Sequence, residues 1–402
     1  MNPRLESLHA YPFERLARLK SGVTPPAGKT HIALSIGEPK HPTPDLIRDT
    51  LVGCLDGLSS YPTTAGTREL REAVAEWLCQ RFGLAPESLD PERHVLPVSG
   101  TREGLFAFAQ CVVGGESGPL VLMPNPFYQI YEGAAILSGA TPWYLPCVAR
   151  TGLPDFESVP ASVWRRCQLL YLCSPANPTG AVIEPAELQW LLSMADEFGF
   201  VIAADECYSE IYLDEDRPPV GLLQAAATAG RHDYRRCVVF HSLSKRSSVP
   251  GLRSGFVAGD ADLLATFHRY RTYHGCAMPL YAQAASIAAW RDEAHVRDNR
   301  SLYRRKFDAV LPILAEVMRV ERPRGGFYLW PETPISDVEF ARLLFARQNV
   351  AVLPGSFLSR VVNGVNPGSG RVRIALVPPL DECVEAAERI RDLLGTLDAD
   401  YP

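Results

Sequence analysis

The chain has 402 residues, a formal net charge of −6 and a sequence pI near 5.9, and 47% of its residues are hydrophobic. The acidic balance argues against nucleic acid as a main partner, no apolar stretch is long enough to span a bilayer, and the N-terminus lacks an apolar secretory core. Its ten cysteines include no Cys-x-x-Cys pair, which predicts reduced thiols in the cytoplasm and no metal site.

Short apolar runs alternate with longer helical patterns through the middle of the chain. This alternation predicts an α/β fold in which a mostly parallel, seven-stranded sheet lies between helices. The predicted strands are residues 95–99, 120–123, 142–145, 169–173, 200–204, 238–242 and 255–258. Helices are expected between most of them, for example at residues 68–81, 101–113 and 185–198.

The two ends of the chain have a different pattern. Residues 1–48 are rich in proline and are expected to be mostly irregular. From about residue 300 onward, helices are expected at 300–319, 335–348 and 381–397, with short strands near 326–330, 350–352 and 372–376. We therefore expect a smaller α/β domain built from both chain ends, residues 1–48 and 291–402, beside a large domain of residues 49–290.

Polar residues follow five of the predicted strands at the point where each strand ends. They are Ser99-Gly100-Thr101, Asn125, Asn177, Asp205 and Lys245. Functional groups in parallel α/β sheets gather just beyond the carboxyl ends of the strands. The sequence therefore predicts one site at this edge of the sheet.

Lys245 is one of only five lysines in a chain whose other cationic positions are arginine. Ser242 precedes it at the end of a predicted strand, and Arg253 follows it. These groups suit a phosphate held beside an amine, and a lysine amine forms a Schiff base with an aldehyde, which arginine cannot do. They indicate pyridoxal 5'-phosphate (PLP), which carries both an aldehyde and a phosphate.

Asp205 and its neighbours are candidates for holding the PLP ring. A buried carboxylate beside the pyridine nitrogen keeps it protonated, and Asp205 suits this role, with a helix cap or a solvated charge as the alternatives. Asn177 and Tyr208 are the candidate donors to the phenolate oxygen of the ring, although Asn-Pro-x-Gly is also common turn chemistry. Glu206 is a further candidate, with a structural role as the alternative, and we expect Cys207 to pack rather than to react.

The phosphate needs backbone N–H groups at a helix start, hydroxyls and a cation. Gly100 and Thr101 precede a predicted helix, and Ser242 and Arg253 complete the candidate set, although Ser-Gly-Thr opens many helices. The face of the ring needs an aromatic partner. The candidates are Phe127, Tyr128 and Tyr131.

A predicted strand near the C-terminus carries Arg371 and Arg373 on the same side. One of them suits the α-carboxylate of a substrate, which an arginine binds through two parallel hydrogen bonds. The alternative is a solvated pair of charges at a sheet edge.

The motifs occur in an order that resembles a known family. Ser-x-Ser-Lys at 242–245 and Pro-Gly-x-Arg at 250–253 come after Asn-Pro-x-Gly at 177–180 and Asp-x-x-Tyr at 205–208. In these motifs, and over nearly its whole length, the chain resembles the fold-type I PLP-dependent aminotransferases of the aspartate aminotransferase superfamily. The resemblance implies a ping-pong cycle in which a donor amino acid leaves as a keto acid before the acceptor enters.

The resemblance also implies a role for each matching residue. Lys245 is implied as the Schiff-base lysine and proton shuttle, Asp205 as the partner of the pyridinium, and Tyr128 as the residue that stacks on the ring. The implied contacts of the ring oxygen are Asn177 and Tyr208, those of the phosphate are Gly100, Thr101, Ser242 and Arg253, and those of the substrate are Gly37, Asn177 and Arg373. Tyr61 resembles the tyrosine that reaches the phosphate of the neighbouring subunit, so a homodimer with shared active sites is implied.

Three local strings, at residues 34–42, 99–104 and 271–276, narrow the resemblance. Together they resemble the N-succinyldiaminopimelate aminotransferases of bacterial lysine biosynthesis. This implies transfer between N-succinyl-L,L-2,6-diaminopimelate and 2-oxoglutarate, which gives N-succinyl-2-amino-6-oxopimelate and glutamate. Such a dianionic substrate needs cations beyond Arg373. Lys40, Arg246 and Arg271 are candidates, although for each of them an ordinary exposed charge is the simpler interpretation.

Other functions remain open from the sequence. One is an aminotransferase for aspartate, alanine or aromatic amino acids, and another is a PLP-dependent C–S β-lyase, which would release pyruvate without an amino acceptor. A transcription regulator with an aminotransferase-like domain would need an added DNA-binding module. We expect none, because the chain starts close to the core motifs and its balance of charges is acidic.

Overall fold

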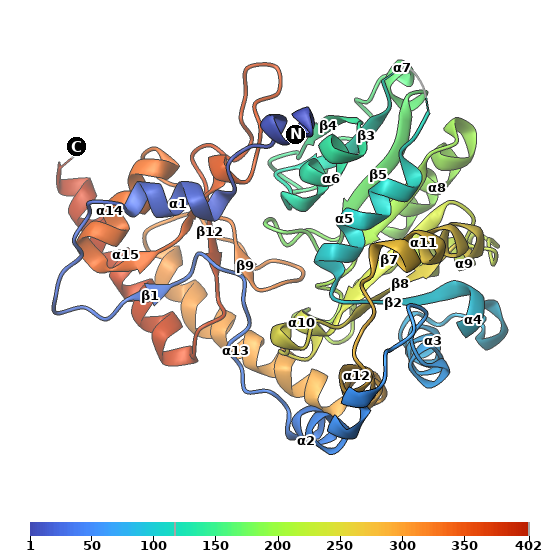
Figure 1. Cartoon of the computed structure of the whole chain (residues 1–402). Helices are drawn as coiled ribbons and strands as arrows, with labels where there is room; N and C mark the ends of the chain where they lie inside the picture. The colour runs from blue at the N-terminus through green and yellow to red at the C-terminus, as the bar shows by residue number, and fades with distance from the viewer. Residues whose placement is uncertain (116–117, 401–402) are drawn as a thin grey trace.

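The largest sheet has seven strands in the order β2-β8-β7-β6-β5-β3-β4 (Figure 1). The computed structural model describes residues 1–115 and 118–400. The strands are β2 (Val95–Val98), β3 (Leu120–Asn125), β4 (Thr141–Pro146), β5 (Cys167–Cys173), β6 (Val201–Asp205), β7 (Cys237–Ser242) and β8 (Gly255–Gly259). β8 runs antiparallel to β2 and β7, and the other neighbours pair in parallel. The predicted α/β fold with a mostly parallel sheet is confirmed.

Helices cover both faces of this sheet because its central strands are apolar on both sides (Figure 1). Along β6, Ile202 and Ala204 pack into one hydrophobic core and Val201 and Ala203 into the other, as the two-residue period of a strand requires. The first core is covered by α3 (Arg68–Phe82), α8 (Pro185–Phe198), α9 (Leu222–Thr228) and α12 (Leu280–Arg291). The second is covered by α5 (Thr101–Val112), α6 (Ile130–Ser138) and α11 (Ala261–His274).

Segments from both chain ends build a second, smaller set of sheets (Figure 1). β1 (Ile32–Ala33) pairs with β10 (Val350–Ala351), and a three-stranded sheet has the order β11 (Leu353–Pro354), β12 (Val372–Ala375), β9 (Tyr328–Leu329). The helices that pack on them are α13 (Ala294–Ala315), α14 (Asp337–Gln348) and α15 (Leu380–Asp400). The domain boundaries expected from the sequence, 49–290 against 1–48 with 291–402, remain a prediction.

Helix α1 (Pro12–Lys20) lies in the region for which the sequence predicted mostly irregular structure. Pro12 occupies the first turn, where a missing N–H breaks no helical hydrogen bond, and Leu16 packs against Leu353 and Phe357. Helix α13 begins and ends earlier than the predicted 300–319, because helix ends are poorly marked by apolar periodicity. The remaining α-helices are α2 (Asp45–Gly53), α4 (Pro91–His94), α7 (Ala161–Trp164) and α10 (Leu243–Arg246). None of the helices described in 1–115 and 118–400 is long and apolar enough to cross a membrane.

The carboxyl ends of β2, β3, β5, β6 and β7 lie at one edge of the large sheet. β6 and β7 are parallel neighbours, so Asp205 at the end of β6 lies beside the strand that leads into Lys245. Because β8 is antiparallel to β7, its amino end lies at the same edge, and Arg253 comes just before it. The fold therefore brings the predicted polar residues to one place.

Candidate active site

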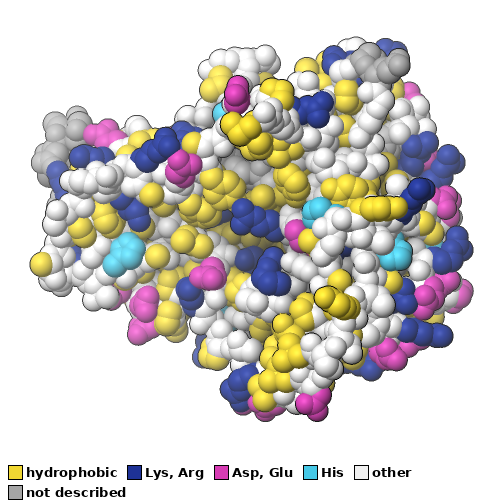
Figure 2. All heavy atoms as spheres, in the orientation of Figure 1, with side chains coloured by type: hydrophobic (Ala, Val, Ile, Leu, Met, Phe, Trp, Pro, Cys, Tyr) yellow, Lys and Arg dark blue, Asp and Glu magenta, His cyan; other side chains and the backbone are white. Residues whose placement is uncertain are grey.

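A cavity of about 410 Å³ lies at this edge of the sheet. Figure 2 shows basic side chains gathered in the middle of the same face, where the surface is hollowed. Ten of the predicted site residues line the cavity: Gly37, Thr101, Tyr128, Asn177, Asp205, Tyr208, Ser242, Lys245, Arg253 and Arg373. Of the other two, Gly100 lies against Arg253, and the side chain of Tyr61 is fully exposed to solvent.

Lys245 reaches the cavity from α10, which begins directly after β7. The hydroxyl of Ser242 caps this short helix by accepting a hydrogen bond from the amide of Ser244 (3.1 Å). The amine of Lys245 donates to the carbonyl of Gly37 at 2.5 Å. The pKa of this amine is lowered to about 8, chiefly by burial; the positive charge of Arg373 contributes to the decrease, and Cys207, Glu38 and Asp205 oppose it. At pH 7 roughly a tenth of the Lys245 amine is therefore neutral and able to accept a proton, far more than for an exposed lysine.

The carboxylate of Asp205 is buried at the end of β6 and faces the cavity. Its hydrogen bonds come from neutral donors, the hydroxyl of Tyr131 (2.7 Å) and the amide of Cys207 (3.3 Å). Burial raises the pKa of Asp205 because the charged form loses its hydration. A buried carboxylate of this kind suits a cationic nitrogen, such as the protonated ring nitrogen of PLP, as its partner in the cavity.

An anion cradle lies where α5 begins. Gly100 has φ +85°, and a Cβ added to it would lie 2.1 Å from a guanidinium nitrogen of Arg253, so only glycine allows this approach. The first amides of the 12-residue helix, together with Thr101, Ser242 and Arg253, surround the same end of the cavity. This donor set, with the buried amine and carboxylate beside it, fits PLP.

Arg373 lines the cavity from β12 of the three-stranded sheet. Its guanidinium donates to the side-chain oxygen of Asn177 (2.9 Å) and to the carbonyl of Ser35 (2.8 Å), and it lies 4.5 Å from the centre of the Tyr328 ring. Its buried Nε atom has no hydrogen-bond partner among the residues described by the structure. Arg371, by contrast, pairs with Glu332 and is not part of the lining. Of the two candidates, Arg373 is placed to bind a carboxylate.

Several lining residues were not predicted from the sequence. The hydroxyls of Tyr328 and Tyr208 form a hydrogen bond of 2.9 Å. The Tyr328 hydroxyl also lies so close to Gly37 that a Cβ added there would be 1.8 Å from it. The others are Tyr11, Pro12, Phe13, Ile36, Arg102, Gln129, Ser244, Pro250, Leu358 and Cys207. The Ser-x-Ser-Lys motif pointed to Ser244 and the position after Thr101 pointed to Arg102, whereas Tyr11 and Tyr328 arrive from distant segments without a local sequence pattern.

The simpler interpretation of an ordinary exposed charge is wrong for Arg246 and Arg271, which are almost completely buried. Neither lines the cavity, and each has a carboxylate partner: Glu293 for Arg246, and Glu103 at 2.7 Å for Arg271. The third candidate, Lys40, is exposed, pairs with Glu38 at 2.6 Å and does not line the cavity.

The neighbouring candidates also have structural explanations. Phe127 stacks on Tyr144 in the core, and Tyr131 holds Asp205 instead of lining the cavity, which leaves Tyr128 as the aromatic candidate. Asn125 exchanges two hydrogen bonds with the backbone of Arg360.

Glu206 and Cys207 follow Asp205 in the chain; a structural role was the alternative for Glu206 and the expectation for Cys207. Glu206 accepts a hydrogen bond from the amide of Leu222 and lies 3.0 Å from His241. The thiol of Cys207 lies 2.9 Å from the hydroxyl of Thr101, and burial raises its pKa well above the usual value. Both environments favour packing and hydrogen bonding over reactivity.

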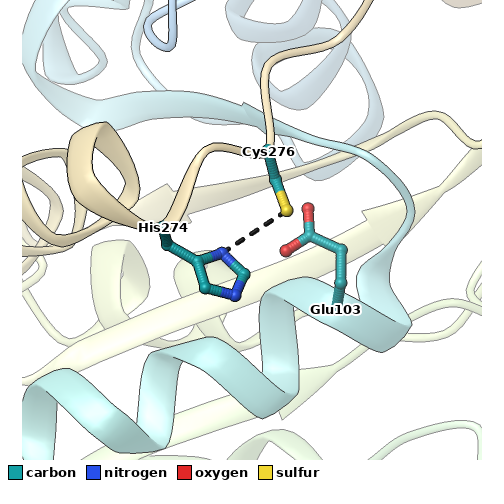
Figure 3. Close-up of side chains that lie close together, drawn as sticks. All are labelled: Glu103, His274 and Cys276. Carbon is teal, nitrogen blue, oxygen red and sulfur yellow. Dashed lines mark hydrogen bonds between the residues drawn. The ribbon is translucent and has the colours of Figure 1, made fainter.

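Glu103, His274 and Cys276 lie together beside the Arg271 ion pair, and their potential metal-ligand atoms are within 4.8 Å of one another (Figure 3). The carboxylate of Glu103 already accepts hydrogen bonds from the amide of Ser99 and from Arg271, both at 2.7 Å. Because Ser99 precedes the cradle at Gly100, Glu103 helps to hold the start of α5.

Comparison with known proteins places this geometry in a family. The profile of the family Aminotransferase class I and II matches residues 29–390. The chain is 34% identical to the LL-diaminopimelate aminotransferase of Desulforudis audaxviator, over 98% of this chain and 97% of that protein.

Two solved structures extend the comparison. An aminotransferase from Neisseria meningitidis matches with a TM-score of 0.94 and 49% identity, over 98% of this chain and all of that one (100%). A probable N-succinyldiaminopimelate aminotransferase from Thermus thermophilus matches with a TM-score of 0.84 and 29% identity, over 95% of this chain and 100% of that one. The chain therefore belongs to the class I and II aminotransferases, PLP-dependent enzymes of fold type I.

Proposed function

We propose that this aminotransferase moves an amino group between N-succinyl-L,L-2,6-diaminopimelate and 2-oxoglutarate, in lysine and diaminopimelate biosynthesis in the cytoplasm. The products are N-succinyl-2-amino-6-oxopimelate and glutamate. The observation that carries the choice of substrate is the charge of the cavity: its lining has arginines in several places but a single carboxylate, Asp205, among the described residues.

The cavity residues have distinct roles in this proposal. Gly100, Thr101, Ser242 and Arg253 hold the phosphate of PLP, Asp205 pairs with its ring nitrogen, Tyr128 stacks on the ring, and Asn177 and Tyr208 contact the ring oxygen. When bound, PLP supplies an aldehyde that combines with amines and a ring that withdraws electrons. Gly37, Asn177 and Arg373 orient the α-carboxylate of the substrate, with the arginine providing the charge.

Lys245 moves the proton in this proposal. Its neutral Nζ accepts the proton that leaves the α-carbon of the amino donor, and it later returns a proton during the second half of the cycle. Burial supports this role because it keeps a useful fraction of the amine unprotonated. The carbonyl of Gly37, which accepts a hydrogen bond from the amine, restrains its position.

Arg102 is the proposed receptor for the far end of the substrate. It lines the cavity next to Thr101, is exposed to solvent, and lies 5.5 Å from the centre of the Tyr11 ring. Succinylation converts the distal ammonium of diaminopimelate into a neutral amide and adds a carboxylate. The distal end then carries only negative charge, which suits an arginine and needs no acidic partner.

Unacylated LL-diaminopimelate is the second candidate, because the named relatives include LL-diaminopimelate aminotransferases. Its distal end keeps an ammonium, which would call for a carboxylate at the mouth of the cavity. Glu38 is the nearby candidate by position, but it pairs with Lys40 and does not line the cavity. The charge pattern therefore favours the succinylated donor.

A panel of donors tests the proposal. Purified protein with PLP and 2-oxoglutarate is given succinyldiaminopimelate, LL-diaminopimelate, aspartate, alanine or phenylalanine, and the glutamate formed is measured. We expect kcat/KM for the succinylated donor to exceed that for LL-diaminopimelate by about tenfold or more. An equal or higher value for LL-diaminopimelate would favour the second candidate, and pyruvate released from an S-substituted cysteine in the absence of 2-oxoglutarate would favour a lyase.

Variants of Arg102 separate the two ends of the substrate. Arg102→Leu should lower kcat/KM for the succinylated donor by about tenfold and change the value for alanine little, because alanine has no distal carboxylate. Arg102→Lys, which keeps the charge, is the matched control and should retain most of the activity. Equal losses for both donors in Arg102→Leu would contradict a distal role.

A homodimer with shared active sites is also part of the proposal. The ring of Tyr61 is fully exposed, and the preceding residues of the chain include further exposed apolar side chains: Leu46, Val52, Leu55 and Leu58. A second subunit would cover these groups and receive Tyr61 at its phosphate cradle. Tyr61→Phe should then loosen PLP binding, and dimers mixed with a Lys245→Ala subunit should show whether Tyr61 acts across the interface.

A further inference from the structure

Asn299 of α13 holds the backbone that carries Lys245. Its side-chain amide donates to the carbonyls of Lys245 and Arg246, both at 3.1 Å. These two residues end the short helix α10, where carbonyls have no donor from the helix itself. Asn299 is almost fully buried, so its two hydrogens replace solvent at the end of this helix.

His41 fixes the orientation of Asn299. Because both hydrogens of the Asn299 amide face carbonyls, its Oδ1 atom must accept, and Nδ1 of His41 lies 2.7 Å from it. The hydrogen of the imidazole is therefore on Nδ1, and Nε2 is an acceptor. Burial lowers the pKa of His41 to about 4, in keeping with a neutral ring. The ring of Tyr303 packs against the same imidazole, with a centroid distance of 4.5 Å and an angle of 46° between the ring planes.

Lys306 completes this network on the other side of the imidazole. Its amine lies 2.7 Å from Nε2 of His41 and donates to the carbonyl of Val377 at 3.1 Å. It is one of only five lysines in the chain, and only 2% of its surface is exposed. Burying an amine has a free-energy cost. Lys306 does not line the cavity, so its burial needs an explanation other than contact with the substrate.

The network also connects the two sides of the active site. Residues 35–41 contact Arg373 through the carbonyl of Ser35, Lys245 through the carbonyl of Gly37, and Ser248 through the carbonyl of His41 (3.0 Å). Val377, at the other end, follows strand β12, which carries Arg373. The amine and the carboxylate-binding arginine come from separate sheets, and these contacts join them.

We infer that His41, Asn299 and Lys306 are positioning residues. They hold the amine of Lys245, which transfers the proton, at a fixed position relative to Arg373, which binds the substrate carboxylate. The inference rests on the proposed function for the roles of Lys245 and Arg373. None of the three residues needs to touch the substrate. Their loss should let α10 shift and admit water to the Lys245 amine, which reduces the rate without removing a reacting group.

The first test measures Lys245 without cofactor or substrate. Apoprotein is labelled with limiting acetic anhydride across a pH series, and modification of Lys245 is quantified by peptide mass spectrometry. In Asn299→Leu and Lys306→Met, the midpoint for Lys245 should rise from about 8 toward the ordinary value of 10.5, because water reaches the amine. A rise of one pH unit makes labelling at pH 7 about tenfold weaker. Lys20→Met, which removes a lysine that lies over the Phe345 ring, is the control and should leave the midpoint unchanged.

The second test compares kcat with KM in the PLP-loaded enzyme. Asn299→Leu and Lys306→Met should lower kcat by about tenfold or more and change the KM of the amino donor less. His41→Asn keeps a donor near the position of Nδ1 and should lose much less than His41→Leu. His41 is only partly buried, so this pair remains informative if a variant of Lys306 does not fold.

The outcome that would overturn the inference is a loss of thermal stability alone. If the labelling midpoint of Lys245 and kcat both stay at wild-type values in Asn299→Leu and in His41→Leu, the three residues serve only to hold the fold. Failure of the proposed function is a separate result. Turnover by Lys245→Ala would reject the role of Lys245 in catalysis, while the labelling midpoints would still report whether the network controls its environment.

Discussion

Replacing Arg246 with methionine tests whether this arginine acts in stability or in substrate binding. Its guanidinium donates to the carbonyl of Ala289 at 2.6 Å and to that of Asp292 at 3.3 Å, and it lies 5.4 Å and 4.9 Å from the ring centres of Trp77 and Trp290. Ala289 is in the last turn of α12, where carbonyls lack helical donors. Methionine keeps much of the packing volume but none of the donors.

The expected loss of stability follows from these contacts. A buried carbonyl without a donor costs about 1–3 kcal/mol, and a cation on aromatic faces contributes about 0.5–2 kcal/mol. The ion pair with Glu293 adds only about 0–1 kcal/mol, because more than a third of the Glu293 side chain is exposed and regains water. Arg246→Met should therefore destabilise the protein by about 3 kcal/mol, with KM for the succinylated donor unchanged.

Urea unfolding followed by tryptophan fluorescence measures this loss, and donor kinetics measure KM. Arg291→Met is the matched control, since Arg291 is half exposed and pairs with exposed Glu76, and it should cost less than about 1 kcal/mol. A loss below about 1 kcal/mol in Arg246→Met, together with a tenfold increase in KM, would refute the structural role and restore Arg246 as a substrate cation.

The remaining predictions concern the cavity. Lys245→Ala should form no glutamate from any donor, and normal turnover would end its assignment. Asp205→Ala should lose about a hundredfold or more in kcat while retaining PLP measured by absorbance, whereas weakened PLP retention with an intact rate at saturation would contradict its role. In the wild-type apoprotein, acetylation of Lys245 should increase as pH rises through about 8, because burial lowers its pKa; a midpoint near the ordinary value of 10.5 would show a hydrated amine. Gly37→Ala should reduce kcat/KM, since the new Cβ would lie 1.8 Å from the Tyr328 hydroxyl, and unchanged kinetics would show that Tyr328 moves freely.

The sequence predicted the large sheet well because its strands are buried on both faces. β6 has five consecutive buried residues, and such runs stand out from the amphipathic helices between them. Groups at the carboxyl ends of parallel strands must share one edge of the sheet, which brought Asp205 and Lys245 together correctly. The short strands of the smaller sheets and helix α1 were harder to define, because their stability depends on contacts with distant segments.

Local sequence patterns did not predict which arginines have a carboxylate partner within the fold. Arg246, Arg271 and Arg373 are chemically equivalent in the sequence, and all three are buried. Glu293 and Glu103, far away in the chain, neutralise the first two, while Arg373 faces the cavity with an unpartnered Nε among the described residues. Of these three arginines, Arg373 is the one that is available to a carboxylate.

By itself the sequence determined the α/β architecture, the chemical groups of the site and the strand ends that carry them, because periodicity and turn chemistry are local properties. The tertiary structure alone decided which charges are compensated, which tautomer His41 adopts and which distant residues, such as Tyr11 and Tyr328, close the cavity. The physical reason is that burial and charge pairing depend on neighbours in space, and a segment of sequence does not specify those neighbours.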